Sequence, residues 1–171
     1  WLLGLVALYA AGPRAGMWAA GIAAVYPPLV VLPSYALSET VFSGVALTAA
    51  FVLQLSADRA RTEAHAPVSR TVLLAAAAGV LAGSAALIRP AMLLYLPLAV
   101  AWLLAARRVA LAVALTVAAF AVITPWTMRN LRVHERFVLI ASEGGVTFWT
   151  GNHPLARGEG DLAANPELKK A

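Results

Sequence analysis

Cysteine is absent from this chain, and charged residues are scarce. Of 171 residues, none is Cys, 8 are Asp or Glu and 13 are Lys or Arg. A chain without cysteine has neither disulfides nor thiolate metal sites. The 3 histidines, His65, His134 and His153, lie far apart, and none has a second ligand at zinc-binding spacing. We therefore predict no metal site here, and the sequence leaves open whether a divalent metal assists.

Signatures of several soluble functions are also missing. No basic stretch alternates with aromatic residues as in a single-strand binder, so nucleic acid is not an expected partner. The turn Ser142-Glu143-Gly144-Gly145 has neither the Lys nor the following helix of a phosphate-binding P-loop. No Ser lies in a nucleophile-elbow context. These absences exclude the commonest nucleotide-binding and hydrolase motifs.

Long apolar runs dominate what is present. Hydrophobic residues make up 61% of the chain and charged residues 12%, and the mean hydropathy is +0.79. The runs have about 16 to 22 residues where complete, near the length that crosses a hydrocarbon core of about 30 Å. They are Trp1–Ala11, Met17–Leu32, Pro33–Ser56, Thr71–Ile88, Ala91–Ala106 and Val109–Thr124. We predict an all-α polytopic membrane helix bundle of about five to six transmembrane helices, some of them partial.

The first run begins without a Met or a charged leader, which is not a signal-peptide pattern. We therefore expect the chain to be an internal piece of a larger membrane protein. Within it, Tyr26-Pro27-Pro28 is expected to break or end a helix, because consecutive prolines remove donors and favour extended backbone. The alternative is an ordinary helix end with Tyr26 at the membrane interface.

The composition changes after Pro125-Trp126, which is expected to end the last run. Phe137–Ala141 and Val146–Thr150 alternate around a Gly-containing turn, which is typical of a β-hairpin. We therefore predict two parts, residues 1–126 within the helix bundle and residues 127–171 as a juxtamembrane segment. The second part begins a small extracytoplasmic α/β or β-containing portion.

Two charged residues lie among the apolar runs. Arg89, in Leu87-Ile88-Arg89-Pro90, falls where one helix ends and the next begins, and its fork of donors suits a phosphate. The alternative is an anchor that snorkels to the membrane surface. Glu39 begins a narrow polar face with Ser43 and Thr48, and an ionisable group in an apolar run is a functional candidate. Its alternative is a carboxylate that reaches interfacial water near a helix N-terminus.

The alternation of helices sorts the loops into two sets. One set, Gly12–Gly16, Ala57–Arg70 and Arg107-Arg108, contains six Arg, so the positive-inside rule predicts that it is cytoplasmic. The other set is then extracytoplasmic and gathers Glu39, Arg89, Trp126, Arg129 and Asn130. The positive-inside rule disfavours arginine on the extracytoplasmic side, so arginines there need another explanation. Binding a lipid phosphate provides one.

Several short motifs occur in a familiar order. They are Tyr26-Pro27, Leu37-Ser38-Glu39-Thr40, Leu87-Ile88-Arg89-Pro90, Pro125-Trp126-Thr127-Met128-Arg129-Asn130, Gly144-Gly145 and Gly151-Asn152-His153-Pro154. In this order the chain resembles the polytopic GT-C glycosyltransferases. The resemblance is to the bacterial branch similar to protein O-mannosyltransferases and the lipid A aminoarabinose transferase.

The resemblance implies a multi-pass enzyme of the bacterial inner membrane whose C-terminal portion is extracytoplasmic. It would transfer a hexose or pentose from a polyprenyl-phosphate donor to an extracytoplasmic lipid, glycan or protein. The acidic catalytic residue of such enzymes would lie upstream of Trp1. Arg89, then Arg129, would bind the donor phosphate, Asn130 would donate to phosphate or sugar, and Glu39 would orient Arg89 or position an acceptor.

Other interpretations stay open. Arg129 and Arg132 also suit attraction to lipid head groups, and Trp126 suits an interfacial anchor better than a sugar platform. A transporter or flippase segment would explain the Pro27-Pro28 break and an intramembrane Glu39, although no second copy of that break occurs in the chain. A non-catalytic scaffold would explain Gly79 and Gly83, four residues apart, as a helix contact.

Overall fold

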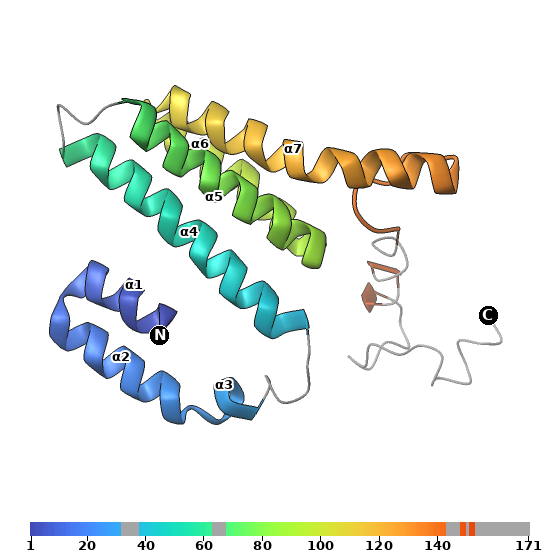
Figure 1. Cartoon of the computed structure of the whole chain (residues 1–171). Coiled ribbons are helices and arrows are strands. Elements are labelled where there is room, and N and C mark those ends of the chain that lie inside the picture. Colours follow the sequence, from blue (N-terminus) through green and yellow to red (C-terminus); the bar gives the residue numbers. More distant parts are fainter. Residues whose placement is uncertain (32–37, 63–67, 143–147, 150, 153–171) are drawn as a thin grey trace.

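The computed structural model describes residues 1–31, 38–62, 68–142, 148–149 and 151–152, and it is helical (Figure 1). The elements are α1 (Leu2–Ala11), α2 (Pro13–Val25), α3 (Pro27–Val31), α4 (Ser38–Thr62), α5 (Val68–Ile88), the 3₁₀ helix η2 (Pro90–Leu94), α6 (Tyr95–Ala105) and α7 (Val109–His134). Prolines stand at the first position of α2, α3 and η2, where a missing N–H costs nothing.

Three helices of the described part, α4, α5 and α7, are long and apolar enough to cross a membrane. Two further apolar helical stretches, Leu2–Ala11 and Pro90–Ala105, are shorter. These lengths suggest a membrane protein, in agreement with the predicted all-α class. The predicted span Ala91–Ala106 is divided, because its first residues form η2 and only Tyr95–Ala105 is α-helical.

The closest helix contact joins α5 to α7. A Cβ atom added to Gly79 would lie 2.3 Å from the carbonyl oxygen of Leu115, and one added to Gly83 would lie 2.7 Å from that of Ala119. Real side chains do not approach this closely, so only glycine permits the two backbones to meet. This is the small-residue packing predicted from the spacing of Gly79 and Gly83.

Alanine extends this contact into the core. Ala75, Ala78, Ala82, Ala85 and Ala86 on α5 are all fully buried. They pack with α4 residues such as Leu53 and with α7 residues such as Leu115 and Ile123, which gives α5 a central position between α4 and α7 (Figure 1). Alanine also has the highest helix propensity, so the same residues favour the helix and its close packing.

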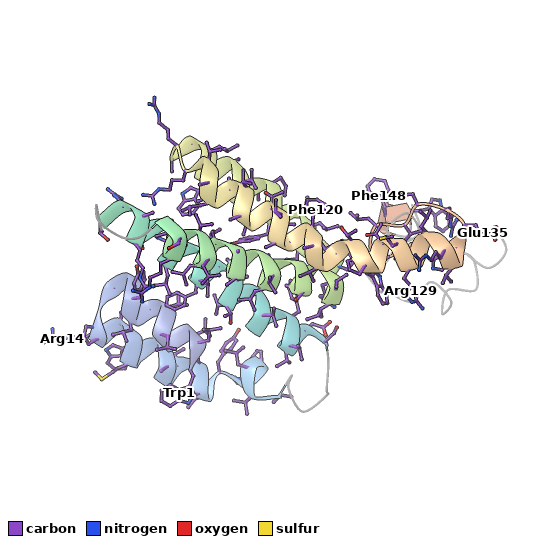
Figure 2. All side chains as sticks on the ribbon, turned by 45° about the horizontal axis from the view of Figure 1, so that its top comes forward. Trp1, Arg14, Phe120, Arg129, Glu135 and Phe148 are labelled. Carbon is purple, nitrogen blue, oxygen red and sulfur yellow. The ribbon has the colours of Figure 1, made fainter. Side chains whose placement is uncertain are left out.

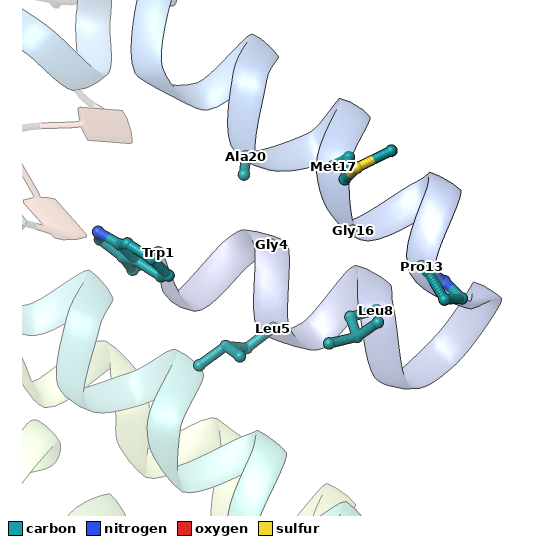
Figure 3. Close-up of a pocket in the computed structure, with 8 residues that line it drawn as sticks. All are labelled: Trp1, Gly4, Leu5, Leu8, Pro13, Gly16, Met17 and Ala20. Atoms are coloured by element: carbon teal, nitrogen blue, oxygen red, sulfur yellow. The ribbon is translucent and has the colours of Figure 1, made fainter.

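A second close contact joins α1 to α2. Added Cβ atoms at Gly4 and Gly16 would come within 2.9 Å and 2.8 Å of side chains on the facing helix, those of Ala20 and Leu8 respectively. A cavity of about 280 Å³ lies beside these glycines (Figure 3). Its lining residues are Trp1, Gly4, Leu5, Leu8, Pro13, Gly16, Met17 and Ala20, none of which carries a titratable side chain, so we assign it no chemistry.

At the helix ends one sequence prediction is confirmed and two are corrected. The break at Tyr26-Pro27 is confirmed, since α2 ends at Val25 and α3 begins at Pro27. The turn predicted for Gly12–Gly16 is limited to Gly12, whose φ is +86°, because α2 already begins at Pro13. The first residues of the predicted run Pro33–Ser56 lie outside the described residues, and α4 runs from Ser38 past the predicted end at Ser56 to Thr62. Glu39 is therefore in the first turn of α4, where the helix dipole favours a carboxylate.

Pro125 does not end the last helix, contrary to prediction. It lies inside α7, which continues to His134 and thus crosses the predicted boundary at residue 126. The hydroxyl oxygen of Thr127 lies 3.2 Å from the carbonyl oxygen of Ile123, one turn back along the same helix. Ile123, two residues before Pro125, is fully buried in the bundle core and fixes this part of α7 against the other helices. Tertiary packing thus outweighs the loss of one helical hydrogen bond.

The predicted hairpin is also corrected. Phe137–Ala141 has no strand pairing, and Phe148 and Trp149 are helical. Most of the predicted second strand, Val146–Thr150, lies outside the described residues. The alternation in residues 137–141 has another cause, since Val138 and Ile140 are both buried and Ile140 packs into a cluster of helix residues.

Gly79→Ala is expected to weaken the α5–α7 contact by about 1–3 kcal/mol, because the new methyl group must displace a backbone carbonyl. The matched control is Gly44→Ala in α4, where an added Cβ meets nothing within 4 Å. Removing a helical glycine at that open position is expected to be neutral or stabilising by up to about 1 kcal/mol. Melting temperatures of both variants in detergent test this. Equal melting temperatures would contradict the proposed packing role of Gly79.

Candidate functional site

Arg89 leaves the helix because of the residue that follows it. Pro90 disfavours the α conformation in its predecessor, and Arg89 accordingly adopts φ −140° and ψ 115°, which is extended backbone. α5 therefore stops at Ile88, and η2 begins at Pro90. The guanidinium is carried on this corner, at the end of an otherwise apolar helix.

Glu39 meets Arg89 at this corner. The Nη2 of Arg89 donates a hydrogen bond to the Oε1 of Glu39, and the two residues are 50 positions apart in the sequence. The side chains are 44% and 41% exposed, so the pair is open to solvent or to a ligand. An ion pair this exposed contributes at most about 1 kcal/mol to stability. An incoming anion therefore has little to overcome in order to share or replace this contact.

A groove of about 370 Å³ adjoins the ion pair on the α4 side. Glu39, Thr40 and Ser43 give it one polar wall from the first turns of α4. Its other residues are mostly apolar and come from α1, α3 and the next turns of α4: Trp1, Leu2, Leu3, Pro28, Leu29, Gly44 and Leu47. Glu39 and Ser43 of the predicted polar face of α4 therefore line this groove, whereas Thr48 does not.

Arg129 lies elsewhere, on the last turns of α7. Its guanidinium carbon is 4.8 Å from the ring centroid of Trp126, and its Nη1 approaches the Oδ1 of Asn130 at 3.5 Å. Figure 2 shows Arg129 at the far end of the molecule from Arg14, on the part of α7 that extends past α5 (Figure 1). Among the described residues, no hydrogen bond or ion pair links Arg129 to Glu39 or Arg89. The structure thus brings the four predicted site residues together as two separate pairs, Glu39 with Arg89 and Arg129 with Asn130.

Asn130 has a structural role in this arrangement. It is 2% exposed, and its Nδ2 donates to the carbonyls of Val138 at 3.2 Å and Ile140 at 3.1 Å. A side-chain amide has two N–H donors, and these two carbonyls use both. The predicted donation from Asn130 to a phosphate or sugar would require breaking these bonds, and the buried position gives a ligand no access.

Two neighbours of Asn130 hold the same segment. The Nε1 of Trp126 donates to the carbonyl of Ile140 at 3.0 Å, and the hydroxyl of Thr127 donates to that of Leu139 at 2.8 Å. We call residues 138–140 the strap. Every bond in this set runs from a side chain of α7 to a main-chain oxygen of the strap. Trp126 is therefore a structural donor, a role that the sequence did not suggest, and Thr127 was missed altogether.

The strap leads back towards the ion pair. Ile140 belongs to the buried cluster that contains Met92 and Leu96, and the half-buried Leu87 packs against this cluster. Leu87 and Met92 flank Arg89 in the sequence. The strap consequently supports the η2 corner from the side of α7, and it does so through apolar contact.

No group of three or more His, Cys, Asp or Glu residues is placed to hold a metal ion in the described ranges. Comparisons with protein-family models, with curated proteins and with solved structures found no match to this chain. The function is therefore inferred from the geometry around Glu39 and Arg89 and from the motifs quoted above.

Asn130→Asp is expected to release the strap, because a carboxylate of the same shape accepts hydrogen bonds and repels the two carbonyls. The cost is expected to be about 1–3 kcal/mol, the range for a buried polar group that loses its partner. Hydrogen exchange of the strap amides should become faster. Arg132→Gln, an exposed change on the same helix, is the control and should leave exchange unaltered. Unchanged exchange in Asn130→Asp would show that the amide does not hold the strap.

Proposed function

We propose that this chain is part of a polytopic membrane glycosyltransferase of the GT-C type that takes its sugar from a polyprenyl-phosphate donor. In this proposal the protein has five to six membrane spans in the bacterial inner membrane, and the acceptor is an extracytoplasmic lipid, glycan or protein. The observation that carries the proposal is the Glu39–Arg89 ion pair. It unites two of the quoted motifs at a half-exposed corner of an apolar helix bundle.

The proposed chemistry follows from the leaving group. Attack on the anomeric carbon expels a phosphate whose negative charge grows in the transition state. A guanidinium held beside that phosphate stabilises the developing charge, and its fixed direction avoids reorganisation during the reaction. Arg89 is held by the extended backbone before Pro90 and by Glu39, so it meets this requirement.

Glu39 has two functions in this scheme. Before the donor binds, it balances the charge of Arg89 near the membrane surface. When the phosphate arrives, the carboxylate remains within reach of one guanidinium edge and sets its direction, while another edge faces the anion. Arg129 is the second choice for phosphate contact, because it is exposed at the end of α7 and its guanidinium contacts Trp126.

Arg89→Ala is expected to lower sugar transfer about 10²–10³-fold, the range for loss of one preorganised donor. The fold should persist, because an exposed ion pair contributes at most about 1 kcal/mol to stability. The assay follows transfer of labelled sugar from polyprenyl-phosphate donors by the intact protein in liposomes. Arg14→Ala is the control, since Arg14 is an exposed arginine in the first turn of α2, far from Arg89 along the bundle.

Transfer that survives in Arg89→Ala, with the protein folded, would make Arg89 a membrane anchor. Absence of transfer from every donor tested, even without mutation, would contradict the glycosyltransferase proposal itself.

Orientation gives an independent test. The proposal puts Ser142 outside the membrane and Ser69 in the cytoplasm, and both are exposed in the structure. Because the chain has no cysteine, single cysteines at these positions report cleanly. An impermeant thiol reagent added to intact cells should label Ser142→Cys and spare Ser69→Cys. The opposite pattern would overturn the assignment of the Glu39–Arg89 site to the outer face.

A transporter or flippase segment is the second candidate, and one observation favours it. The break between α2 and α3 adjoins the groove that contains Glu39, since Pro28 and Leu29 line that groove. A broken helix beside a carboxylate is a common arrangement in substrate pathways. Movement of a lipid-linked sugar across liposome membranes without transfer would favour this candidate.

A further inference from the structure

The end of the bundle away from Glu39 and Arg89 is rich in arginine. Three bonds bring its turns together: Tyr9 donates to Asp58 at 2.8 Å, Ser56 donates to the carbonyl of Thr71 at 2.8 Å, and Arg108 donates to the carbonyl of Ala57. These bonds gather the starts or ends of α1, α4, α5 and α7. The arginines in or beside these turns are Arg14, Arg59, Arg61, Arg70, Arg107 and Arg108.

A crevice of about 500 Å³ lies at this end. Arg107 and Arg108 form part of its lining, together with Ala60 of α4 and Thr71 and Val72 of α5. Arg108 is half-buried and directed at the carbonyl of Ala57, whereas Arg107 is exposed. The crevice therefore combines one fixed guanidinium, one accessible guanidinium and apolar walls.

The backbone at Arg107 is unusual for an arginine. Arg107 donates its N–H to the carbonyl of Leu104 and Arg108 donates to that of Leu103, both at 2.8 Å. Together these bonds form a Schellman motif that closes α6, and Arg107 occupies its left-handed position with φ 58°. Glycine takes this conformation without steric cost, and a side chain there is strained. A strained side chain at an accessible crevice indicates that the side chain itself has a use.

We propose that this crevice binds the phosphate of an anionic phospholipid, with Arg107 as the principal contact. The position fits, because the turn lies at the ends of α4, α5 and α7, the three helices long enough to cross a membrane. Trp102, partly exposed one turn earlier on α6, suits the interfacial layer where head groups lie. A guanidinium fork matches phosphate oxygens, and the adjoining apolar walls suit the start of acyl chains rather than a free phosphate ion.

The test uses thermal melting of the intact protein in neutral detergent, titrated with phosphatidylglycerol. Arg107→Gly removes the side chain and relieves the strained backbone, so its melting temperature without lipid should stay the same or rise. The lipid concentration that gives half of the stabilisation should increase about tenfold, as expected for the loss of one charged hydrogen-bond contact. Arg107→Lys should retain part of the effect.

Arg61→Gln is the matched control, since it removes one exposed charge at the same end of the bundle without lining the crevice. It should change the half-stabilising concentration by about twofold or less, as expected for an exposed charge. The proposal fails if Arg61→Gln and Arg107→Gly weaken binding equally, or if phosphatidylcholine stabilises as well as phosphatidylglycerol. It also fails if inorganic phosphate reproduces the stabilisation, or if Arg107→Gly melts at a lower temperature without lipid.

Discussion

The close approach of α5 and α7 at Gly79 and Gly83 is the contact on which the other features depend. It fixes the position of α7 along the axis of α5. As a result, Ala119 and Ile123 of α7 lie in the same buried cluster as Ala82 and Ala86 of α5. The last turns of α7 consequently extend past the end of α5 and provide the donors that hold the strap. One contact between glycine and main chain thus sets the position of both Arg89 and the segment that supports its corner.

Polar side-chain bonds between the helices lie near the two ends of this bundle, and buried apolar residues fill its middle. In the described part, every buried side-chain nitrogen or oxygen has a hydrogen-bond partner. This is what an apolar surrounding requires, because an unpaired polar group there is costly. The ends differ in kind. At one end an ion pair stays half-exposed, and at the other the polar side chains Tyr9, Ser56 and Arg108 tie the turns together.

Local rules predicted the features that local chemistry decides. Apolar runs indicated most of the helices, prolines indicated the break after Tyr26 and the corner at Arg89, and the glycine spacing indicated a helix contact at Gly79 and Gly83. Pro125 shows the limit of such rules, since its effect depends on partners remote in sequence, namely the buried cluster around Ile123 and the carbonyl of Leu139 that accepts from Thr127. The bond between Glu39 and Arg89 is another non-local fact, which the sequence suggested only as one option.

Asn130 and the strap illustrate a second limit. A sequence shows that an amide follows an arginine near a helix end, but it does not show whether that amide faces a ligand or a main-chain carbonyl. Carbonyl acceptors leave no trace in the amino-acid sequence, because every residue has one. The same is true of Thr127. The apolar alternation at Val138 and Ile140 was interpreted as a strand because burial against helices and burial in a sheet select the same residues at this spacing.

The way in which the strap is held has a consequence for how this region tolerates change. Trp126, Thr127 and Asn130 recognise only main-chain oxygens, so the anchoring bonds are indifferent to which residues occupy the strap. What they require is the number of residues between the end of α7 and Val138. Inserting or deleting a single residue in that connection would shift every carbonyl out of register, whereas replacing the residue at 139 would leave the bonds in place. For these bonds, the number of residues between α7 and the strap therefore matters more than which residues the strap contains.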